Sequence, residues 1–289
     1  MVRRVLIVTA LAALTVMAVL SLQHLYRSKL PKPDHVAEKL SWIQVPRPEL
    51  ERPCGDLDSK RVFLVIGQSN AANHGETPGS SEHGLVWAGG KCYALVDPLP
   101  GGTGRGGSIW TRFADLWFDR TGESTVFVVL AVDATTVGEW VSHPKLVARF
   151  GNLLTSLRDH TVELDAVLWQ QGEADAKLST DQLDYIFSAK KVVEKIREIT
   201  AAQPIIKALS TRCRSSPSDV VRAAVMGLSQ ESLGIYLGPD TDTIKTDARH
   251  DGCHFSEHGL NAAAVLWISR VLYLTGGLDS RDGAFISEG

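Results

Sequence analysis

The sequence lacks the charge pattern of a nucleic-acid-binding protein. Its 289 residues carry 30 Lys and Arg against 33 Asp and Glu, a formal net charge of -3, with no run of basic residues. Aromatic residues make up 7% of the chain and are not interleaved with Lys or Arg. An electrostatic footprint for nucleic acid is missing, so we expect no nucleic-acid partner. Internal repeats and low-complexity tracts are also missing from the sequence.

Cysteine is scarce, and its spacing argues against a zinc motif. The four cysteines are Cys54, Cys92, Cys213 and Cys253, and no two of them form a C-x-x-C unit. An even number suits two disulfides in an oxidising compartment, although three pairings are possible. We expect Cys54 to pair with Cys92 and Cys213 with Cys253. Each bond would close a loop of about 40 residues and contribute about 4 kcal/mol through chain entropy.

One long hydrophobic run lies at the N-terminus. Arg3 and Arg4 precede the uncharged stretch 5–22, which approaches the roughly 17 to 25 residues of a membrane-spanning helix. Because no convincing cleavage site follows, we expect a membrane anchor with a short cytoplasmic end at 1–4. The rest of the chain would then lie outside the cytoplasm, in the periplasm or the extracellular space. Cleavage of the run as a signal peptide would instead release a secreted protein.

Composition divides the remaining chain into three parts. Residues 23–53 contain five prolines among charged residues, which suits a semi-extended linker. Residues 54–277 are long enough for one domain of about 220 residues with a full core. Residues 278–289 are expected to form a loose tail.

Short apolar segments alternate with amphipathic ones through the predicted domain. Apolar runs predict strands at 62–66, 125–132, 166–169, 205–209 and 235–237. Helical spacing of apolar residues predicts helices at 108–120, 146–157, from 180 onward, 218–233 and 257–274. This alternation indicates an α/β fold with a doubly wound parallel sheet. Residues 75–104 have no interpretable periodicity.

Polar residues stand where the predicted strands end or the last helix begins. In open α/β sheets, ligands bind beyond the carboxyl ends of the strands. The polar residues at this edge are Ser69, Gln171, Glu173, Asp251 and His254. A hydroxyl, an imidazole and a carboxylate are the parts that acyl transfer requires. A spacing of three residues on a turn lets the Asp251 carboxylate reach Nδ1 of His254, which leaves Nε2 free for Ser69.

Two further motifs carry less weight. Gly102, Gly104 and Gly107 formally match G-x-G-x-x-G, but no strand precedes them, so we expect no dinucleotide cofactor. His250, His254 and His258 are spaced by four, as on a metal-binding helix face. The glycine and serine between them make a continuous helix improbable, so we expect no metal site.

Four ordered blocks resemble those of the SGNH hydrolases. The blocks are Gly67-Gln68-Ser69-Asn70, Gly106-Gly107-Ser108, Trp169-Gln170-Gln171-Gly172-Glu173-Ala174-Asp175 and Asp251-Gly252-Cys253-His254-Phe255. More narrowly, they resemble the branch that includes sialate O-acetylesterase and the acetylxylan esterases. The resemblance implies a three-layer α/β/α fold, no cofactor or metal, and hydrolysis of acetyl esters on carbohydrate. It implies Ser69 as nucleophile, His254 as base and Asp251 as the acid that orients the base.

The resemblance also implies an oxyanion hole. Its donors would be the backbone N–H groups of Ser69 and Gly107 and the side-chain amide of Gln171. Two positions depart from the wider SGNH pattern, because Gln68 replaces an aspartate before the nucleophile and Gln171 replaces an asparagine. Gln68 and Asn70 would support the nucleophile loop.

Several roles stay open at this stage. Glu173 is either a second carboxylate near the histidine or a clamp that holds the Ser69 loop. Trp140 is either a sugar-stacking ring or a core residue, and Arg112 and Arg249 either bind a substrate carboxylate or form salt bridges. Two other functions use the same residues: acyl transfer to a glycan hydroxyl, and glycan binding without catalysis.

Overall fold

The structure, a computed structural model, describes residues 34–199 and 203–275. The chain divides between His35 and Val36, and the fold is that of the second unit, Val36–Gly289. The expected cytoplasmic end 1–4, membrane anchor 5–22 and tail 278–289 lie outside the described residues. Within the described ranges, no helix is both long and apolar enough to cross a bilayer.

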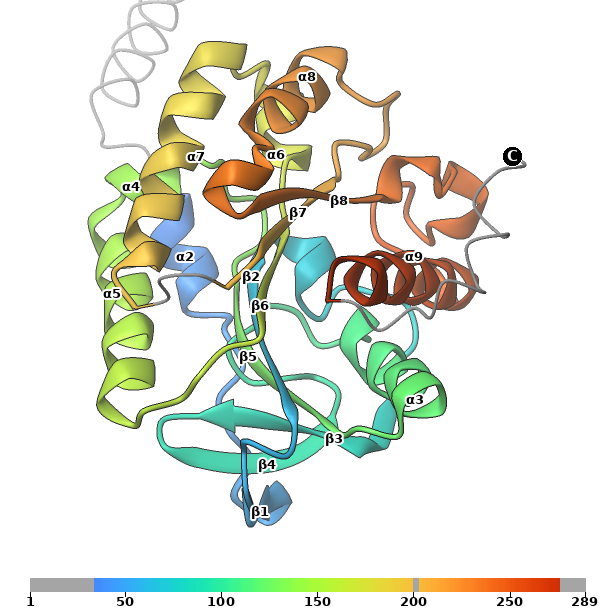
Figure 1. Ribbon diagram of the computed structural model, residues 1–289. Helices are drawn as coiled ribbons and strands as arrows, with labels where there is room; N and C mark the ends of the chain where they lie inside the picture. The colour runs from blue at the N-terminus through green and yellow to red at the C-terminus, as the bar shows by residue number, and fades with distance from the viewer. Residues whose placement is uncertain (1–33, 200–202, 276–289) are drawn as a thin grey trace, which may run out of the picture. The chain divides into compact units, whose positions relative to one another are not determined.

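A mixed eight-stranded sheet forms the centre of the fold (Figure 1). Its strand order is β1-β4-β3-β5-β2-β6-β7-β8. The strands from β3 to β8 in that order are parallel, whereas β4 is antiparallel to both β3 and β1. The strands are β1 Glu51–Arg52, β2 Arg61–Gly67, β3 Ser80–Ala88, β4 Lys91–Val96, β5 Thr125–Ala131, β6 Ala166–Gln170, β7 Ile205–Leu209 and β8 Ile235–Asp240.

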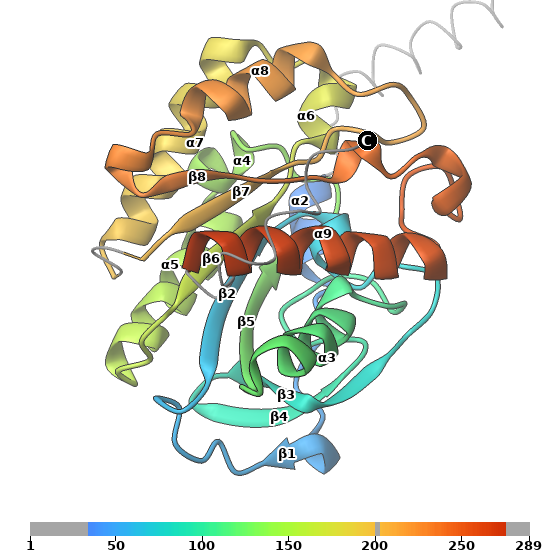
Figure 2. The same ribbon diagram turned by 45° about the vertical axis from the view of Figure 1, so that its right-hand side comes forward.

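Helices cover both faces of this sheet (Figures 1 and 2): α3 and α9 lie on one face, and α5, α7 and α8 lie on the other. The α-helices are α2 His35–Leu40, α3 Ile109–Thr121, α4 Glu139–Ser142, α5 Pro144–Asp159, α6 Glu173–Leu178, α7 Gln182–Arg197, α8 Asp219–Leu228 and α9 Glu257–Thr275. Short 3₁₀ turns are η1 Pro48–Leu50, η2 Ser69–Ala71, η3 Glu231–Leu233, η4 Thr241–Thr243 and η5 Thr246–Ala248.

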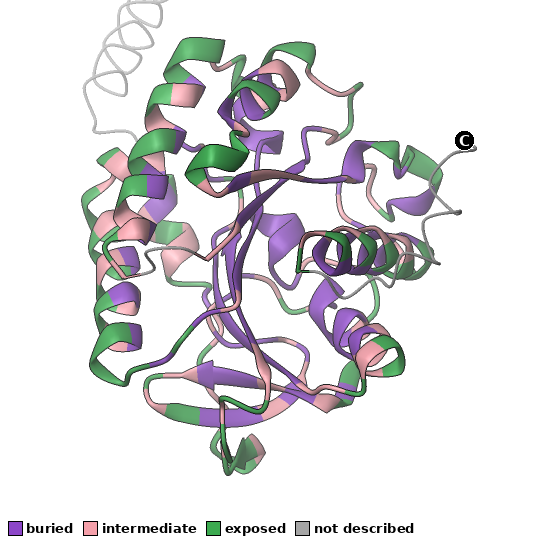
Figure 3. Ribbon diagram, in the orientation of Figure 1, coloured by how far each residue is buried: buried purple, intermediate pink, exposed green. Residues whose placement is uncertain are grey.

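Strand β2 shows why the sheet needs helices on both faces. Phe63 and Val65 belong to the apolar cluster under α3 and α9. Leu64 and Ile66 belong to the cluster under α5, α7 and α8. Alternate side chains point to opposite faces of a strand, so a strand that is apolar throughout must be covered twice. Strands β2, β5, β6 and β7 are accordingly buried along almost their whole length, whereas the edge strand β1 is exposed, and the outer surfaces of the helices carry exposed residues (Figure 3).

The expectation of a wholly parallel sheet is wrong at one edge. The segment without interpretable periodicity contains the antiparallel hairpin β3–β4. A register shift between Ser81 and Leu85 interrupts the alternation that would have identified β3. Gly89 and Gly90 supply the two positive φ angles, 59° and 85°, of a two-residue hairpin turn.

The described part of the expected linker 23–53 packs onto the domain. Val36 and Ile43 belong to the core and are 1% and 7% exposed. The backbone of Gln44 exchanges hydrogen bonds with Gly101 and Gly102, each 2.9 Å long. This segment therefore lies on the surface of the domain, with its proline and charged residues mostly outward and its few apolar residues buried. The packed unit begins before Cys54.

Two disulfides join distant parts of the chain. Cys54 is bonded to Cys92, and Cys213 is bonded to Cys253. Both expected pairings are therefore confirmed. The second bond ties the loop after β7 to the loop before α9.

Candidate active site

Ser69 lies at the point where the strand order reverses. Strand β2 has β5 on one side and β6 on the other, and successive crossovers leave it in opposite directions. Such a switch point opens a crevice at the carboxyl ends of the strands. Gly67 ends β2 with φ of +144°, and a Cβ there would lie 1.9 Å from the carbonyl oxygen of Gln170. Only glycine fits this turn, which directs the chain into η2 at Ser69.

No hydrogen bond to a described residue fixes the hydroxyl of Ser69, so only the backbone conformation of the turn positions it. The residue is 2% exposed, and its hydroxyl makes no hydrogen bond to the described residues. It is nevertheless not one of the fully buried polar atoms that lack a partner, so the oxygen reaches solvent. Its backbone N–H also has no acceptor in the described part of the chain.

Asp251 and His254 form a hydrogen-bonded pair on the loop before α9. One oxygen of Asp251 accepts the backbone N–H groups of Cys253 and His254 at 2.9 and 2.8 Å. The other oxygen lies 2.9 Å from Nδ1 of the His254 ring. This bond favours the tautomer with the proton on Nδ1, which leaves a lone pair on Nε2. The contact expected from the three-residue spacing is therefore present.

Asp251 stays ionised because it is surrounded by donors. Burial alone would raise its pKa, but the N–H groups of His254 and Cys253 and the His254 ring lower the pKa well below its usual range. Arg214 adds a guanidinium 3.0 Å from the oxygen that faces the ring. A permanent carboxylate beside Nδ1 stabilises the imidazolium that forms when Nε2 accepts a proton.

A buried clamp joins the Ser69 loop to the His254 loop. Nδ2 of Asn70 donates to Glu173 at 2.7 Å and to the carbonyl of Cys253 at 3.4 Å. The hydroxyl of Ser210 donates to the same oxygen of Glu173 at 2.8 Å. Burial raises the pKa of Glu173, and its second oxygen has no partner among the described residues. These contacts favour the clamp over the second-acid role for Glu173.

Gln68 fastens the nucleophile loop from the other side. Its side-chain oxygen accepts the backbone N–H groups of Ala174 and Gly172 at 3.1 and 3.5 Å. An aspartate there would accept the same bonds, but it would be a charge at a position that is 2% exposed. The neutral amide therefore suits this site.

Two of the three expected oxyanion donors are already engaged. The N–H of Gly107 donates to the carbonyl of Gly75 at 2.8 Å. The amide of Gln171 is fully buried and donates to the carbonyl of Thr135 at 3.3 Å and to the carboxylate of Asp175. Neither group is free for an oxyanion, so the prediction is corrected for both, and the Ser69 N–H remains.

The three expected substrate-binding side chains are also occupied elsewhere. Arg112 donates to the carbonyl of Thr77 and to Glu257, both at 2.9 Å, and so fixes a loop. Arg249 is 4% exposed and donates to three backbone carbonyls. Trp140 is 3% exposed and packs edge-on against Phe150. All three are structural, since a substrate would have to displace these contacts.

Two neighbours of His254, His74 and Asp133, and the lysine paired with Asp133 were not predicted from the sequence. The ring of His74 stacks on the His254 ring, with centroids 5.0 Å apart. A carboxylate oxygen of Asp133 and one ring nitrogen of each histidine lie within 4.8 Å of one another. Lys39 is 2.5 Å from Asp133. Asp133 directly follows the predicted strand 125–132, so the rule that located Ser69 would have located it. His74 directly precedes the segment 75–104, and no sequence pattern identifies it as a site residue.

Burial and charge set the protonation of these neighbours. Burial lowers the pKa of His74 to about 4. For Asp133, burial opposes ionisation, but the hydrogen bond from Lys39 and the nearby histidines outweigh it and lower the pKa. The site therefore holds a neutral His74 and an ionised Asp133 around neutral pH.

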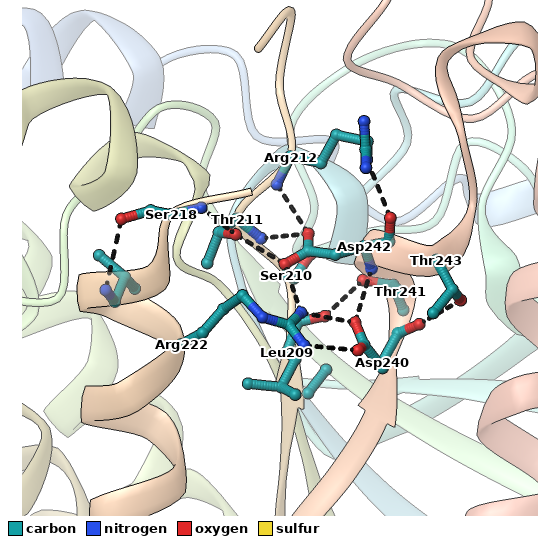
Figure 4. Close-up of polar contacts among 12 residues, drawn as sticks. Leu209, Ser210, Thr211, Arg212, Ser218, Arg222, Asp240, Thr241, Asp242 and Thr243 are labelled. Atoms are coloured by element: carbon teal, nitrogen blue, oxygen red, sulfur yellow. Dashed lines mark hydrogen bonds and ion pairs between the residues drawn. The ribbon is translucent and has the colours of Figure 1, made fainter. Parts of the chain in front are cut away.

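A second carboxylate network fixes the loop that follows β7 (Figure 4). Asp242 accepts the backbone N–H groups of Thr211 and Arg212, each at 2.7 Å, and lies 2.9 Å from Arg222. Burial would raise the pKa of Asp242, but these bonds and that from the Thr211 hydroxyl lower it. The loop so held continues into Cys213 and thereby reaches Cys253 beside His254.

Comparisons with known proteins identify the family and the fold. Residues 100–265, more than half of the chain, match the family described as carbohydrate esterase, sialic acid-specific acetylesterase. That range includes Asp251 and His254 but not Ser69. No curated protein matches the chain.

Solved structures share the fold. A protein from Arabidopsis thaliana is 21% identical, with a TM-score of 0.60 over 76% of this chain and 100% of its own. A family 3 carbohydrate esterase from Clostridium thermocellum is 15% identical, with a TM-score of 0.51 over 75% of this chain and 98% of its own. A carbohydrate acetylesterase from Xanthomonas citri has the same identity and TM-score, over 75% of this chain and 57% of its own. The chain belongs to the carbohydrate esterase family of sialic acid-specific acetylesterases and is a carboxylic ester hydrolase.

Proposed function

We propose that the chain hydrolyses O-acetyl esters on carbohydrate, with Ser69 as nucleophile, His254 as general base and Asp251 as the residue that orients the base. The observation that carries the proposal is the Asp251–His254 hydrogen bond, which leaves Nε2 of His254 unpaired. The Asn70–Cys253 contact supports it, because it fastens the residue after Ser69 to the residue before His254.

The proposed reaction uses these residues in turn. Nε2 of His254 takes the proton as the Ser69 oxygen attacks the acetyl carbonyl carbon, and the negative charge collects on the carbonyl oxygen. The N–H of Ser69, which has no acceptor among the described residues, would donate to that oxygen. Collapse breaks the ester bond, and His254 returns the proton to the departing sugar hydroxyl. Water then attacks the acetyl-enzyme with His254 again as base, which releases acetate and restores Ser69.

The test measures acetate released from an acetylated sugar and from an aryl acetate. Ser69→Ala should remove turnover of both and remove the acetyl-enzyme seen by mass spectrometry after rapid quenching. Ser81→Ala provides a matched control, because Ser81 bonds Asp115 on α3, away from this loop. Turnover by Ser69→Ala equal to that of the unaltered chain contradicts the proposal. Acetyl transfer to an added glycan in place of acetate release would indicate a transferase.

We also propose that the domain acts outside the cytoplasm. Two disulfides support this location, since such bonds persist in oxidising compartments. Fractionation of cells, with protease added to intact cells or spheroplasts, tests whether the domain is accessible from outside and whether it remains with the membrane.

A further inference from the structure

Three metal-ligating side chains converge beside the proposed catalytic base. One ring nitrogen of His74, one of His254 and a carboxylate oxygen of Asp133 lie within 4.8 Å of one another. They come from three loops: the one after η2, the one before α9 and the one after β5. The histidine spacing in the sequence involves His250, His254 and His258, for which we expect no metal site, and in the structure His250 and His254 precede α9 and share no helix with His258.

Hydrogen bonds leave one lone pair free on each imidazole. Nε2 of His74 lies 3.1 Å from the Thr103 hydroxyl oxygen. That hydroxyl donates to the carbonyl of Ala131 and accepts the N–H of Asp133, so its remaining lone pair suits a proton on Nε2 of His74. Nδ1 of His74 is then unprotonated. Nδ1 of His254 bonds Asp251, which leaves Nε2 unprotonated.

We propose that His74, Asp133 and His254 bind one divalent transition metal ion, with Zn²⁺ as the best fit, and that the bound ion blocks the base. Two imidazoles and a carboxylate are a common zinc ligand set. Thr103 and Asp251 hold the two rings from behind, as outer partners of metal-binding histidines do. An ion on Nε2 of His254 occupies the lone pair that the proton of Ser69 would need.

A neighbouring group of His250, Asp251 and His254 satisfies the same distance limit, but its chemistry is poorer. Both oxygens of Asp251 are taken up by donors: the N–H groups of Cys253 and His254 on one, the His254 ring and Arg214 on the other. Metal binding there would have to break the bond that orients His254. Asp133 forms an ion pair with Lys39 and with no other Lys or Arg among the described residues.

Lys39 competes with the metal ion. Its ammonium lies 2.5 Å from one oxygen of Asp133, so a divalent cation must displace or repel it. Removal of the ammonium should therefore tighten metal binding, whereas removal of a ligand should weaken it.

The test titrates the full chain with ZnCl₂ by calorimetry and with CoCl₂ by visible absorption, in the Ser69→Ala background so that turnover plays no part. One ion should bind per chain. His74→Ala and Asp133→Asn should each weaken binding by about tenfold or more, and Lys39→Met should tighten it by about tenfold. His160→Ala is a matched control, because His160 is an exposed histidine outside the cluster.

Inhibition provides the second readout, which rests on the proposed function whereas metal binding does not. In chains that retain Ser69, Zn²⁺ should inhibit aryl acetate hydrolysis. The inhibition constant for Zn²⁺ should change from variant to variant in parallel with the dissociation constant of the metal. Binding without any esterase activity would refute the proposed function and leave the metal site standing. Failure to bind, affinity unchanged by His74→Ala and Asp133→Asn, or affinity lost only in His250→Ala would overturn the metal site.

Discussion

The guanidinium of Arg214 lies 3.0 Å from Oδ2 of Asp251, the same oxygen that accepts the hydrogen bond from Nδ1 of His254. Arg214 also donates to the backbone carbonyl of Asp251 at 3.2 Å. The carboxylate is therefore shared between a permanent cation and a group that must become a cation during the reaction. The permanent cation weakens the hold of Asp251 on the imidazolium.

Arg214→Gln should move the acid limb of the pH–rate profile for kcat/KM to higher pH, by about half a unit. Without the guanidinium, the Asp251 carboxylate stabilises the imidazolium that forms in the reaction more strongly. The measurement is aryl acetate hydrolysis across the pH range. Arg214→Lys keeps the charge and should keep the limb in place. A limb that moves to lower pH in Arg214→Gln contradicts the argument.

The two disulfides should differ in what they contribute. Replacing both cysteines of either pair by alanine should lower the free energy of unfolding by as much as about 4 kcal/mol, since the two loops are of similar length. Only the Cys213–Cys253 pair adjoins His254, so only its removal should also lower kcat/KM, by about tenfold, at a temperature where both variants are folded. Urea unfolding and aryl acetate kinetics measure the two effects. Equal kinetic losses in both variants would contradict a local role.

Sequence reasoning predicted the segments that form the candidate site better than it predicted the contacts of their side chains. Ser69, Asp251 and His254 could be placed because each follows a buried strand or precedes a helix, and the order of parallel strands brings such positions to one edge. The five predicted strands are confirmed as β2, β5, β6, β7 and β8. These features depend on apolar runs and on local spacing, both of which a sequence displays directly.

The missed features depend on contacts between distant segments. Gly107 has an N–H that could serve an oxyanion, but the sequence does not reveal that Gly75 already accepts it. Arg249 has a cation that could bind a carboxylate, but three carbonyls surround it in the fold. Residue type fixes what a side chain can bond, whereas tertiary structure decides which of those bonds are already made.

Glu173 should prove to be a clamp and not an acid. Glu173→Gln keeps an oxygen for Asn70 and Ser210, so it should lower the free energy of unfolding by only about 1 kcal/mol and preserve most of kcat. Glu173→Ala removes the buried acceptor that Asn70 and Ser210 share and should cost about 3 kcal/mol together with a large loss of kcat. Urea unfolding and initial rates distinguish the two variants. A stable Glu173→Gln with kcat lowered more than a hundredfold would instead indicate proton transfer by this carboxyl group.

His74 should make the protein less stable as the pH falls. Burial, with a smaller effect of the His254 and Lys39 charges, lowers the pKa of His74 from 6.5 to about 4. Between these values the unfolded chain binds a proton that the folded chain does not, so stability declines as the pH drops through this window. The full effect, reached below the folded pKa, is at most about 3 kcal/mol.

The matched variant is His74→Gln, which cannot titrate. Between about pH 7 and pH 4.5, the free energy of unfolding of the unaltered chain should fall by about 2 kcal/mol more than that of His74→Gln, as measured by urea unfolding at each pH. Asp133 and Asp251 have lowered pKa values and contribute stability that is lost at more acidic pH, but both are present in the two chains and largely cancel. Parallel pH dependence of the two chains would contradict the lowered pKa of His74, because His74 would then bind its proton as readily in the folded chain as in the unfolded one.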